Sequence, residues 1–121
     1  MTSTHEKGDK AEILAVNYLQ NKGYEILHRN WHFHHYELDV IARKDSMLAV
    51  IEVKSLFRNA LQEPFQAVNL SKQQMIIAAT NAYIRKYNIE DEVRFDVVSI
   101  VFGMQQPVLE HIENAFYPRV R

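Results

Sequence analysis

The sequence predicts one α/β domain spanning residues 1–121, with a mixed β-sheet flanked by helices. Three observations predict this class. Two segments carry apolar residues at helical spacing, several shorter apolar segments are typical of strands, and together they follow the order α-β-β-β-α-β-β. A chain of 121 residues is also long enough to bury a core of its own.

The first helix is expected over residues 5–22, where apolar side chains recur three and four positions apart. These residues are Ala11, Leu14, Ala15, Tyr18 and Leu19. Gly23 is expected to end the helix, and a first strand is expected over residues 24–31. Two further strands, joined by a polar turn at residues 44–46, are expected within residues 35–55.

A second helix is expected after a loop at residues 56–70. Ser71 and Gln74 fit a capping box, S-x-x-Q, which predicts the start of the helix. The helix would then run over residues 72–87. Its buried stripe is predicted to contain Met75, Ile76, Ala79, Ala82 and Tyr83.

The C-terminal part of the chain predicts two more strands. Residues 94–102, RFDVVSIVF, are strongly apolar, which is typical of a strand in the centre of a sheet. A weaker strand is expected at residues 108–112. No repeat or low-complexity segment interrupts this order, so one domain accounts for the whole sequence.

The composition narrows the classes of function. Apolar residues make up 47% of the chain and charged residues 24%, as in ordinary globular proteins. The absence of cysteine excludes disulfides, thiolate zinc sites and thiol catalysis. With no signal-peptide pattern and no apolar segment of roughly 20 residues, we expect a cytoplasmic protein without membrane contact. A net charge of −1 counts against nucleic-acid binding, although acidic catalytic sites lower the net charge of nucleases.

The register of the expected hairpin follows from its apolar residues. If the numbers of paired residues sum to 91, one face is wholly apolar, whereas a slip by one residue mixes the two faces. The pairs on the apolar face are Leu38 with Val53, Val40 with Ile51, and Ala42 with Ala49. On the other face, the same register places Asp39 opposite Glu52. It also places Glu37 opposite Lys54.

Two facing carboxylates need a cation between them. Like charges about 4 Å apart repel by roughly 4 kcal/mol at an effective dielectric constant of 20. Asp39 opposite Glu52 therefore indicates a metal, whereas Glu37 opposite Lys54 also fits a plain ion pair. Glu12 shares a helical face with apolar residues, where a carboxylate either reaches out to water or meets a cation. Three acids without histidine suit Mg²⁺ or Mn²⁺, and we expect these three as the metal ligands.

Lys54 completes a candidate catalytic set with Asp39, Glu52 and Glu12. It lies two residues after Glu52, on the same strand face and next to the expected metal. This arrangement is typical of a metal-dependent phosphodiesterase, in which the metal polarises the phosphate and lowers the pKa of a bound water. The lysine would stabilise charge on the phosphate or orient the attacking water.

Six short motifs extend over most of the chain. They are G-D-K-A-E (8–12), R-N-W (29–31), E-L-D-V-I-A-R (37–43), I-E-V-K-S (51–55), A-V (67–68) with Lys72, and R-F-D-V-V (94–98). As a set they resemble the YraN family, small bacterial proteins classed as predicted endonucleases. That family is similar to archaeal Holliday-junction resolvases of the PD-(D/E)xK nuclease superfamily. The resemblance implies a restriction-endonuclease-like fold, with Asp39, Glu52 and Lys54 in the core catalytic roles and Glu12 as the helical acid.

The sequence departs from the family pattern at two positions. Tyr36 stands where the family often has glycine before E-x-D. Leu56 stands where an arginine often follows V-K-[ST], which removes one phosphate contact unless Arg58 replaces it.

Three residues are the candidate nucleic-acid contacts. Lys72, at the start of its helix, could bind phosphate together with free backbone N–H groups, and a solvated lysine is the equal alternative. Arg58 is the second candidate, and Glu37 is expected to support Lys54.

The sequence thus favours an Mg²⁺-dependent or Mn²⁺-dependent endonuclease acting on DNA, with branched or junction DNA implied by the resemblance. One alternative is a nucleic-acid-binding module that keeps the site without turnover, and another is a protein-interaction platform. An intact set of Asp39, Glu52 and Lys54 favours the enzyme, because a pure binder has no need of the lysine. A homodimer would suit symmetric cleavage of two strands, but no interface is evident in the sequence.

Overall fold

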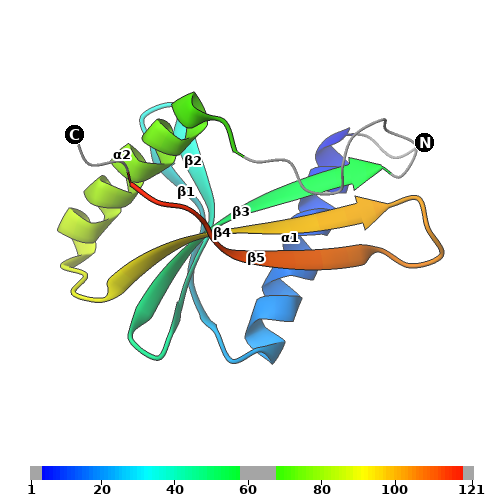
Figure 1. Ribbon diagram of the computed structural model, residues 1–121, viewed down its shortest axis with the longest axis horizontal. Coiled ribbons are helices and arrows are strands. Elements are labelled where there is room, and N and C mark those ends of the chain that lie inside the picture. Colours follow the sequence, from blue (N-terminus) through cyan, green and yellow to red (C-terminus); the bar gives the residue numbers. More distant parts are fainter. Residues whose placement is uncertain (1–3, 58–67, 119–121) are drawn as a thin grey trace.

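A five-stranded mixed sheet with one helix on each face forms the fold (Figure 1). The computed structural model describes residues 4–57 and 68–118, with the side chains of the first helix described from Asp9 onward. The elements are α1 (Thr4–Asn21), β1 (Glu25–Phe33), β2 (Tyr36–Lys44), β3 (Met47–Phe57), α2 (Leu70–Tyr87), β4 (Glu92–Phe102) and β5 (Val108–Phe116). The predicted α/β class and order of elements are confirmed.

The strands lie in the sheet in chain order, from β1 to β5. Strands β3 and β4 are parallel, and the chain passes between them through α2, whereas the other neighbouring pairs are antiparallel. Strand β4 has a neighbour on each side and is buried throughout residues 95–100, so its predicted central position is confirmed. Much of the predicted loop at residues 56–70 lies outside the described residues.

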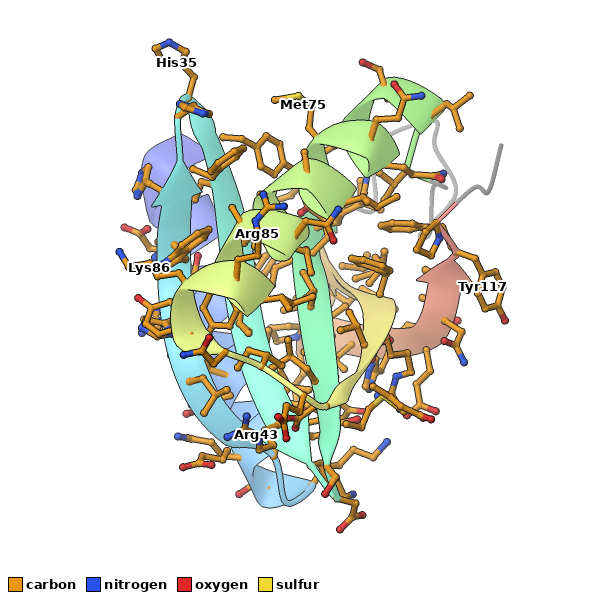
Figure 2. The ribbon with its side chains drawn as sticks, turned by 90° about the vertical axis from the view of Figure 1, so that its left-hand side faces the viewer. His35, Arg43, Met75, Arg85, Lys86 and Tyr117 are labelled. Carbon is orange, nitrogen blue, oxygen red and sulfur yellow. The ribbon has the colours of Figure 1, made fainter. Side chains whose placement is uncertain are left out.

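Two apolar clusters, one on each face, hold the helices to the sheet. The first joins α1 to residues of β2, β3 and β4, and it includes Ala15, Leu19 and Ile51. The second joins α2 to the other face and includes Ile76 and Tyr83. Figure 2 shows α2 in front of the strands and α1 behind them. Because both faces are covered, the central strands are apolar on both sides, as RFDVVSIVF predicted.

Helix α1 follows its predicted pattern. Ala11, Ala15 and Leu19 are buried against the sheet, and the partly buried side chains of Leu14 and Tyr18 pack against the same cluster. The helix ends at Asn21, and the chain turns through Gly23 at a φ of 96°, a conformation that favours glycine.

Helix α2 begins earlier than the capping box predicted. Asn69 is the N-cap, and its Oδ1 accepts a hydrogen bond from the backbone N–H of Lys72 at 2.8 Å. Ser71 consequently lies inside the first turn, so the predicted S-x-x-Q cap is wrong. Asparagine is as good an N-cap residue as serine, and Asn69 stands two positions earlier in the chain. At the other end, Asn88 caps the helix in the left-handed conformation.

The buried stripe of α2 differs from the prediction at Met75. Ile76, Ala79 and Tyr83 are buried, but Met75 is 45% exposed and lies at the surface in Figure 2. The stripe has the spacing i, i+3 and i+7, and Met75 stands about 100° away from Ile76 around the helix. Lys72, four residues before Ile76, instead lies on the face that covers the sheet.

Candidate metal centre

Strands β2 and β3 pair in the predicted register, but the ladder ends before the predicted pairs Asp39–Glu52 and Glu37–Lys54. The regular ladder runs from Lys44 opposite Met47 to Val40 opposite Ile51, with residue numbers that sum to 91. One step beyond, the backbone N–H of Val53 donates a hydrogen bond to Asp39 Oδ2 at 2.9 Å. A side-chain carboxylate thus accepts this bond from β3 next to the end of the ladder.

The predicted apolar face is wrong at its end. Val40 and Val53 pack in the cluster under α1, whereas Leu38 packs in the cluster under α2. Alternation of side chains between the two faces holds along a regular ladder, and this ladder ends at Val40, two residues after Leu38. Since both faces of this sheet are covered by a helix, Leu38 is buried on either one.

Glu52 is a buried acid with a lysine partner. It lies on β3, and its side chain is 9% exposed. The ammonium nitrogen of Lys72 lies 2.5 Å from its Oε1. The helical position of Lys72 explains the contact, because its side chain extends the sheet-facing stripe of α2 towards β3. The sequence predicted Lys72 as a phosphate contact and did not predict this ion pair.

Asp39 lies in a strongly negative environment. Burial, followed by the charges of Glu52 and Glu12, raises its pKa to about 7, although the hydrogen bond from Val53 and the charge of Lys72 lower it. The charges of Glu52 on β3 and Glu12 on α1 therefore both act on Asp39 on β2. Among the described residues, however, these three acids do not form a group whose ligand atoms all lie within 4.8 Å of one another, so their joint role as metal ligands stays a prediction.

Glu12 is held in place by the R-N-W motif of β1. Its Oε1 accepts hydrogen bonds from Asn30 Nδ2 at 2.8 Å and from Arg29 Nε at 3.1 Å. Asn30 has a φ of 53°, a conformation that asparagine tolerates better than most residues. The Glu12 side chain is only 13% exposed, so it points towards the packed side of α1, as predicted. The sequence contained the motif but gave no reason to connect it with Glu12.

Lys54 and Glu37 are not brought together. Lys54 is half-buried on β3, opposite Ser99 in the parallel ladder with β4, and it makes no ion pair among the residues that the structure describes. Glu37 instead contacts His32 across the β1–β2 pair, with Nε2 and Oε2 3.0 Å apart. The other predicted contact, Arg58, lies outside the described ranges.

Tyr36 is a site neighbour that the sequence marked only as a departure from the family pattern. Burial raises the pKa of its hydroxyl, and the charges of Glu52 and Asp39 raise it further. The Tyr36 ring packs against the cluster under α2. A bulky phenol three residues before Asp39 therefore takes up space beside the acids where a glycine would leave it open.

A second group of possible ligand atoms lies on β4 and β5. Atoms of Asp96, His111 and Glu113 lie within 4.8 Å of one another. However, the Arg94 guanidinium donates two hydrogen bonds of 2.9 Å to Asp96 and lies 3.3 Å from Glu113. His111 Nε2 is also 2.8 Å from Asp96 Oδ2. These contacts form an ion-pair network, and Glu52 with Lys72 and Glu12 with Arg29 are paired in the same way.

The network joins α1 to the edge of the sheet. The Tyr18 hydroxyl lies 3.0 Å from His111 Nδ1, and Arg94 donates a hydrogen bond to the Tyr24 hydroxyl. Burial alone would raise the pKa of Asp96, but its contacts with His111 and Arg94 lower it below the ordinary value. An aspartate inside RFDVVSIVF could have indicated such partners, because a buried carboxylate requires them.

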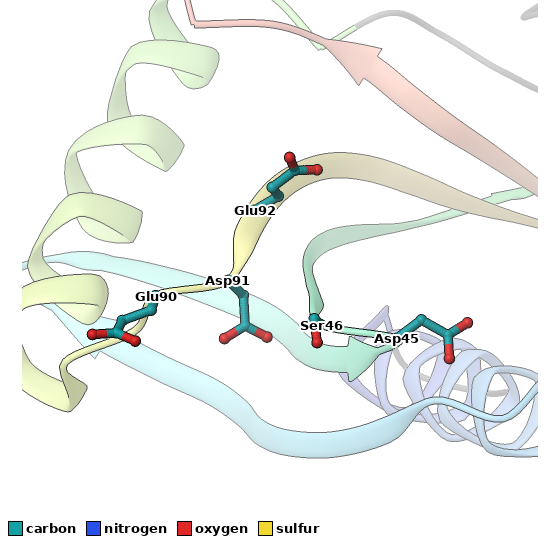
Figure 3. A pocket seen from close by; sticks show the side chains of 5 residues that line it. All are labelled: Asp45, Ser46, Glu90, Asp91 and Glu92. Atoms are coloured by element: carbon teal, nitrogen blue, oxygen red, sulfur yellow. The ribbon is translucent and has the colours of Figure 1, made fainter.

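An acidic depression at the far end of the hairpin is separate from this site. It has a volume of about 530 Å³ and is lined by Asp45, Ser46, Glu90, Asp91 and Glu92 (Figure 3). Two of these residues form the β2–β3 turn, which is the end of β2 opposite to Asp39. Asp91 already forms a bidentate ion pair with Arg43, at 2.8 and 3.1 Å.

No helix in the described part of the chain is long and apolar enough to cross a membrane.

Comparison with known proteins places the chain in a family. Residues 11–100 match the family described as "Uncharacterised protein family UPF0102". A UPF0102 protein of Parabacteroides distasonis is 43% identical over 121 residues and covers 100% of both chains. Another, from Phocaeicola vulgatus, is 42% identical over 120 residues and covers 99% of both, and one from Bacteroides thetaiotaomicron is 37% identical over 98% of both. The chain belongs to the UPF0102 family, which is the YraN group that its motifs resemble.

Proposed function

We propose that this member of the UPF0102 family is a metal-dependent endonuclease that hydrolyses DNA phosphodiester bonds. The observation that carries the proposal is that Glu52 of β3 and Glu12 of α1 both act on Asp39 of β2, with Lys54 two residues after Glu52. The raised pKa of Asp39 supports it, because burial and then the charges of two nearby carboxylates cause the shift.

The donor set fits a hard divalent cation. Asp39, Glu52 and Glu12 offer only carboxylate oxygens, which suit Mg²⁺ or Mn²⁺. A divalent ion held by Asp39 and Glu52 would turn their mutual repulsion into attraction. Glu12 would reach it directly or through water, with Arg29 and Asn30 fixing the orientation of its carboxylate.

The protein's own residues would then have two roles, holding the metal and stabilising charge on the phosphate. When bound, the metal supplies Lewis-acid activation of the phosphate and of a water. Asp39 and Glu52 would hold the ion beside the end of the β2–β3 ladder. Lys54, two residues beyond Glu52, would stabilise the negative charge that develops on the phosphate or orient the attacking water.

DNA with branches or junctions is the proposed substrate class, and this part of the proposal rests on the family resemblance. A homodimer would allow symmetric cleavage of two strands. The alternatives are a DNA-binding module without turnover and a protein-interaction platform.

The direct test is a cleavage panel of single-stranded, duplex, flap and four-way-junction DNA with Mg²⁺ and with Mn²⁺. Cleavage of none of these, in either metal, would favour the alternatives.

The first prediction concerns metal binding. Asp39→Asn should weaken Mn²⁺ binding by at least about 10²-fold, because it removes one of the charged ligands from a site built only from carboxylates. Isothermal titration calorimetry on the wild type and the variant measures the difference. Asp45→Asn is the matched control, because Asp45 is an exposed aspartate in the turn of the same hairpin. Equal affinity of the wild type and Asp39→Asn would rule out a metal site at Asp39.

A second prediction concerns DNA binding without chemistry. If phosphate contacts dominate, the logarithm of the binding constant should fall linearly with the logarithm of the salt concentration. The chain has 14 Lys and Arg residues against 15 Asp and Glu residues, which suggests few phosphate contacts and a shallow slope. Fluorescence anisotropy in EDTA at several salt concentrations measures that slope. An affinity that does not change with salt would point to a protein partner instead.

A further inference from the structure

Lys72 is anchored by its backbone and exposed along its side chain. Its N–H group donates a hydrogen bond to the N-cap Asn69, which fixes the start of the side chain at the first turn of α2. The side chain is 39% exposed, and it reaches inward to place Nζ 2.5 Å from Glu52 Oε1. A long flexible side chain with this exposure can leave its partner without disturbing the helix.

The lysine occupies a place where the proposed site needs positive charge. Glu52 is nearly buried, and the ammonium of Lys72 neutralises it. Glu12 has Arg29 and Asn30 as partners, and Asp39 accepts the N–H of Val53. Lys72 of α2 therefore neutralises Glu52 and neither of the other two acids.

We propose that Lys72 is a substitute cation, which neutralises Glu52 in the metal-free protein and is released when a divalent ion binds there. This inference rests on the proposed function, since it concerns the regulation of the same site. A protonated lysine has donors only and cannot ligate a metal. At contact distance two cations on one carboxylate repel strongly, so the metal and the ammonium compete for Glu52.

The released ammonium has a natural second partner. It would lie at the edge of the site, on the first turn of α2, where a phosphate group of bound DNA would be the nearest strong acceptor. Lys72 would then contribute to DNA binding only when the metal is present. The sequence prediction of a phosphate contact and the observed ion pair would describe two states of the same residue.

The metal affinity of Lys72→Met tests the first half of this inference. Mn²⁺ should bind this variant up to about fivefold more tightly than the wild type, the upper scale of one partly exposed ion pair. Lys86→Met, at the last turn of the same helix, should bind Mn²⁺ as the wild type does, because Lys86 contacts only the Tyr87 ring among the described residues. Lys72→Gln should behave like Lys72→Met, and circular dichroism checks that each variant is folded.

The second half is tested by DNA affinity with and without metal. In a Lys54→Met background, chosen to limit cleavage, adding Lys72→Met should lower DNA affinity several-fold in Mn²⁺ and leave it nearly unchanged in EDTA. The same loss under both conditions would overturn the release of Lys72. Equal or weaker Mn²⁺ binding by Lys72→Met would overturn the competition while the proposed nuclease site stands. A wild type that binds no Mn²⁺ would remove both proposals.

Discussion

Lys54→Met is expected to lower DNA cleavage by at least about 10²-fold, the scale of losing one preorganised electrostatic donor. Methionine keeps most of the side-chain volume and removes only the charge. Because a protonated lysine cannot ligate the metal, Mn²⁺ binding and folding should be retained. Single-turnover cleavage of the preferred DNA, with calorimetric Mn²⁺ titration of the same preparations, measures both effects.

The competing explanation of Lys54 is an exposed ion pair with Glu37. Such a pair would contribute about 0–1 kcal/mol to the free energy of unfolding and nothing to catalysis. In the structure Glu37 contacts His32 instead, so the ion pair between Lys54 and Glu37 that this explanation requires is not observed. Lys86→Met serves as the control for loss of a lysine charge elsewhere. A wild type that cuts DNA and a Lys54→Met variant that cuts it equally well would refute the proposed role.

The register of the hairpin could be predicted because burial of apolar residues determines it. Val40 opposite Ile51 and Ala42 opposite Ala49 leave no polar residue on the face under α1, and the structure has these pairs. The same argument predicted Asp39 opposite Glu52 without reference to any relative, and the observed ladder ends one pair before them. The register of a regular ladder can be predicted from the sequence because side chains alternate between the two faces with a period of two residues.

Irregular and long-range features could not be predicted in the same way. Leu38 lies beyond the end of the regular ladder and packs on the other face, and an alternating pattern contains no signal for where a ladder ends. The contact of Lys72 with Glu52 depends on how α2 crosses the sheet, with the helix cap at Asn69. The partners of Asp96 come from β5 and from the same strand, so only the need for partners was predictable and not their identity.

Metal-free Asp39→Asn is expected to be more stable than the wild type at pH 8, by roughly 2–4 kcal/mol in the free energy of unfolding. Burial and the charge of Glu52 raise the pKa of Asp39 from 3.8 to about 7. Between about pH 4 and pH 7, the folded wild type therefore retains a proton that the unfolded chain has already lost. Its stability is highest below the unfolded pKa and falls as the pH rises from about 4 to about 8.

Asparagine carries no titratable proton, so this part of the pH dependence should disappear in the variant. Urea unfolding in EDTA at pH 5 and pH 8 measures the difference, and the two proteins should differ least at pH 5. The other titrating groups are common to both proteins and cancel in the comparison. Asp45→Asn should follow the wild type at both pH values. A less stable Asp39→Asn at pH 8 would mean that the bond from Val53 outweighs the repulsion from Glu52.

Adding Mn²⁺ at pH 8 should narrow the stability difference by up to about 2.7 kcal/mol, and it should reverse the order where the metal-free difference is smaller than that. A ligand that binds only the folded state stabilises it by about 2.7 kcal/mol at one hundred times its dissociation constant, and only the wild type retains the Asp39 carboxylate. If the two acids bound no metal, Asp39→Asn would raise the free energy of unfolding equally with and without Mn²⁺. A narrower difference or a reversal in Mn²⁺ would instead show that the repulsion between Asp39 and Glu52 is retained because a divalent cation relieves it. That dependence separates a metal site from a strained hairpin.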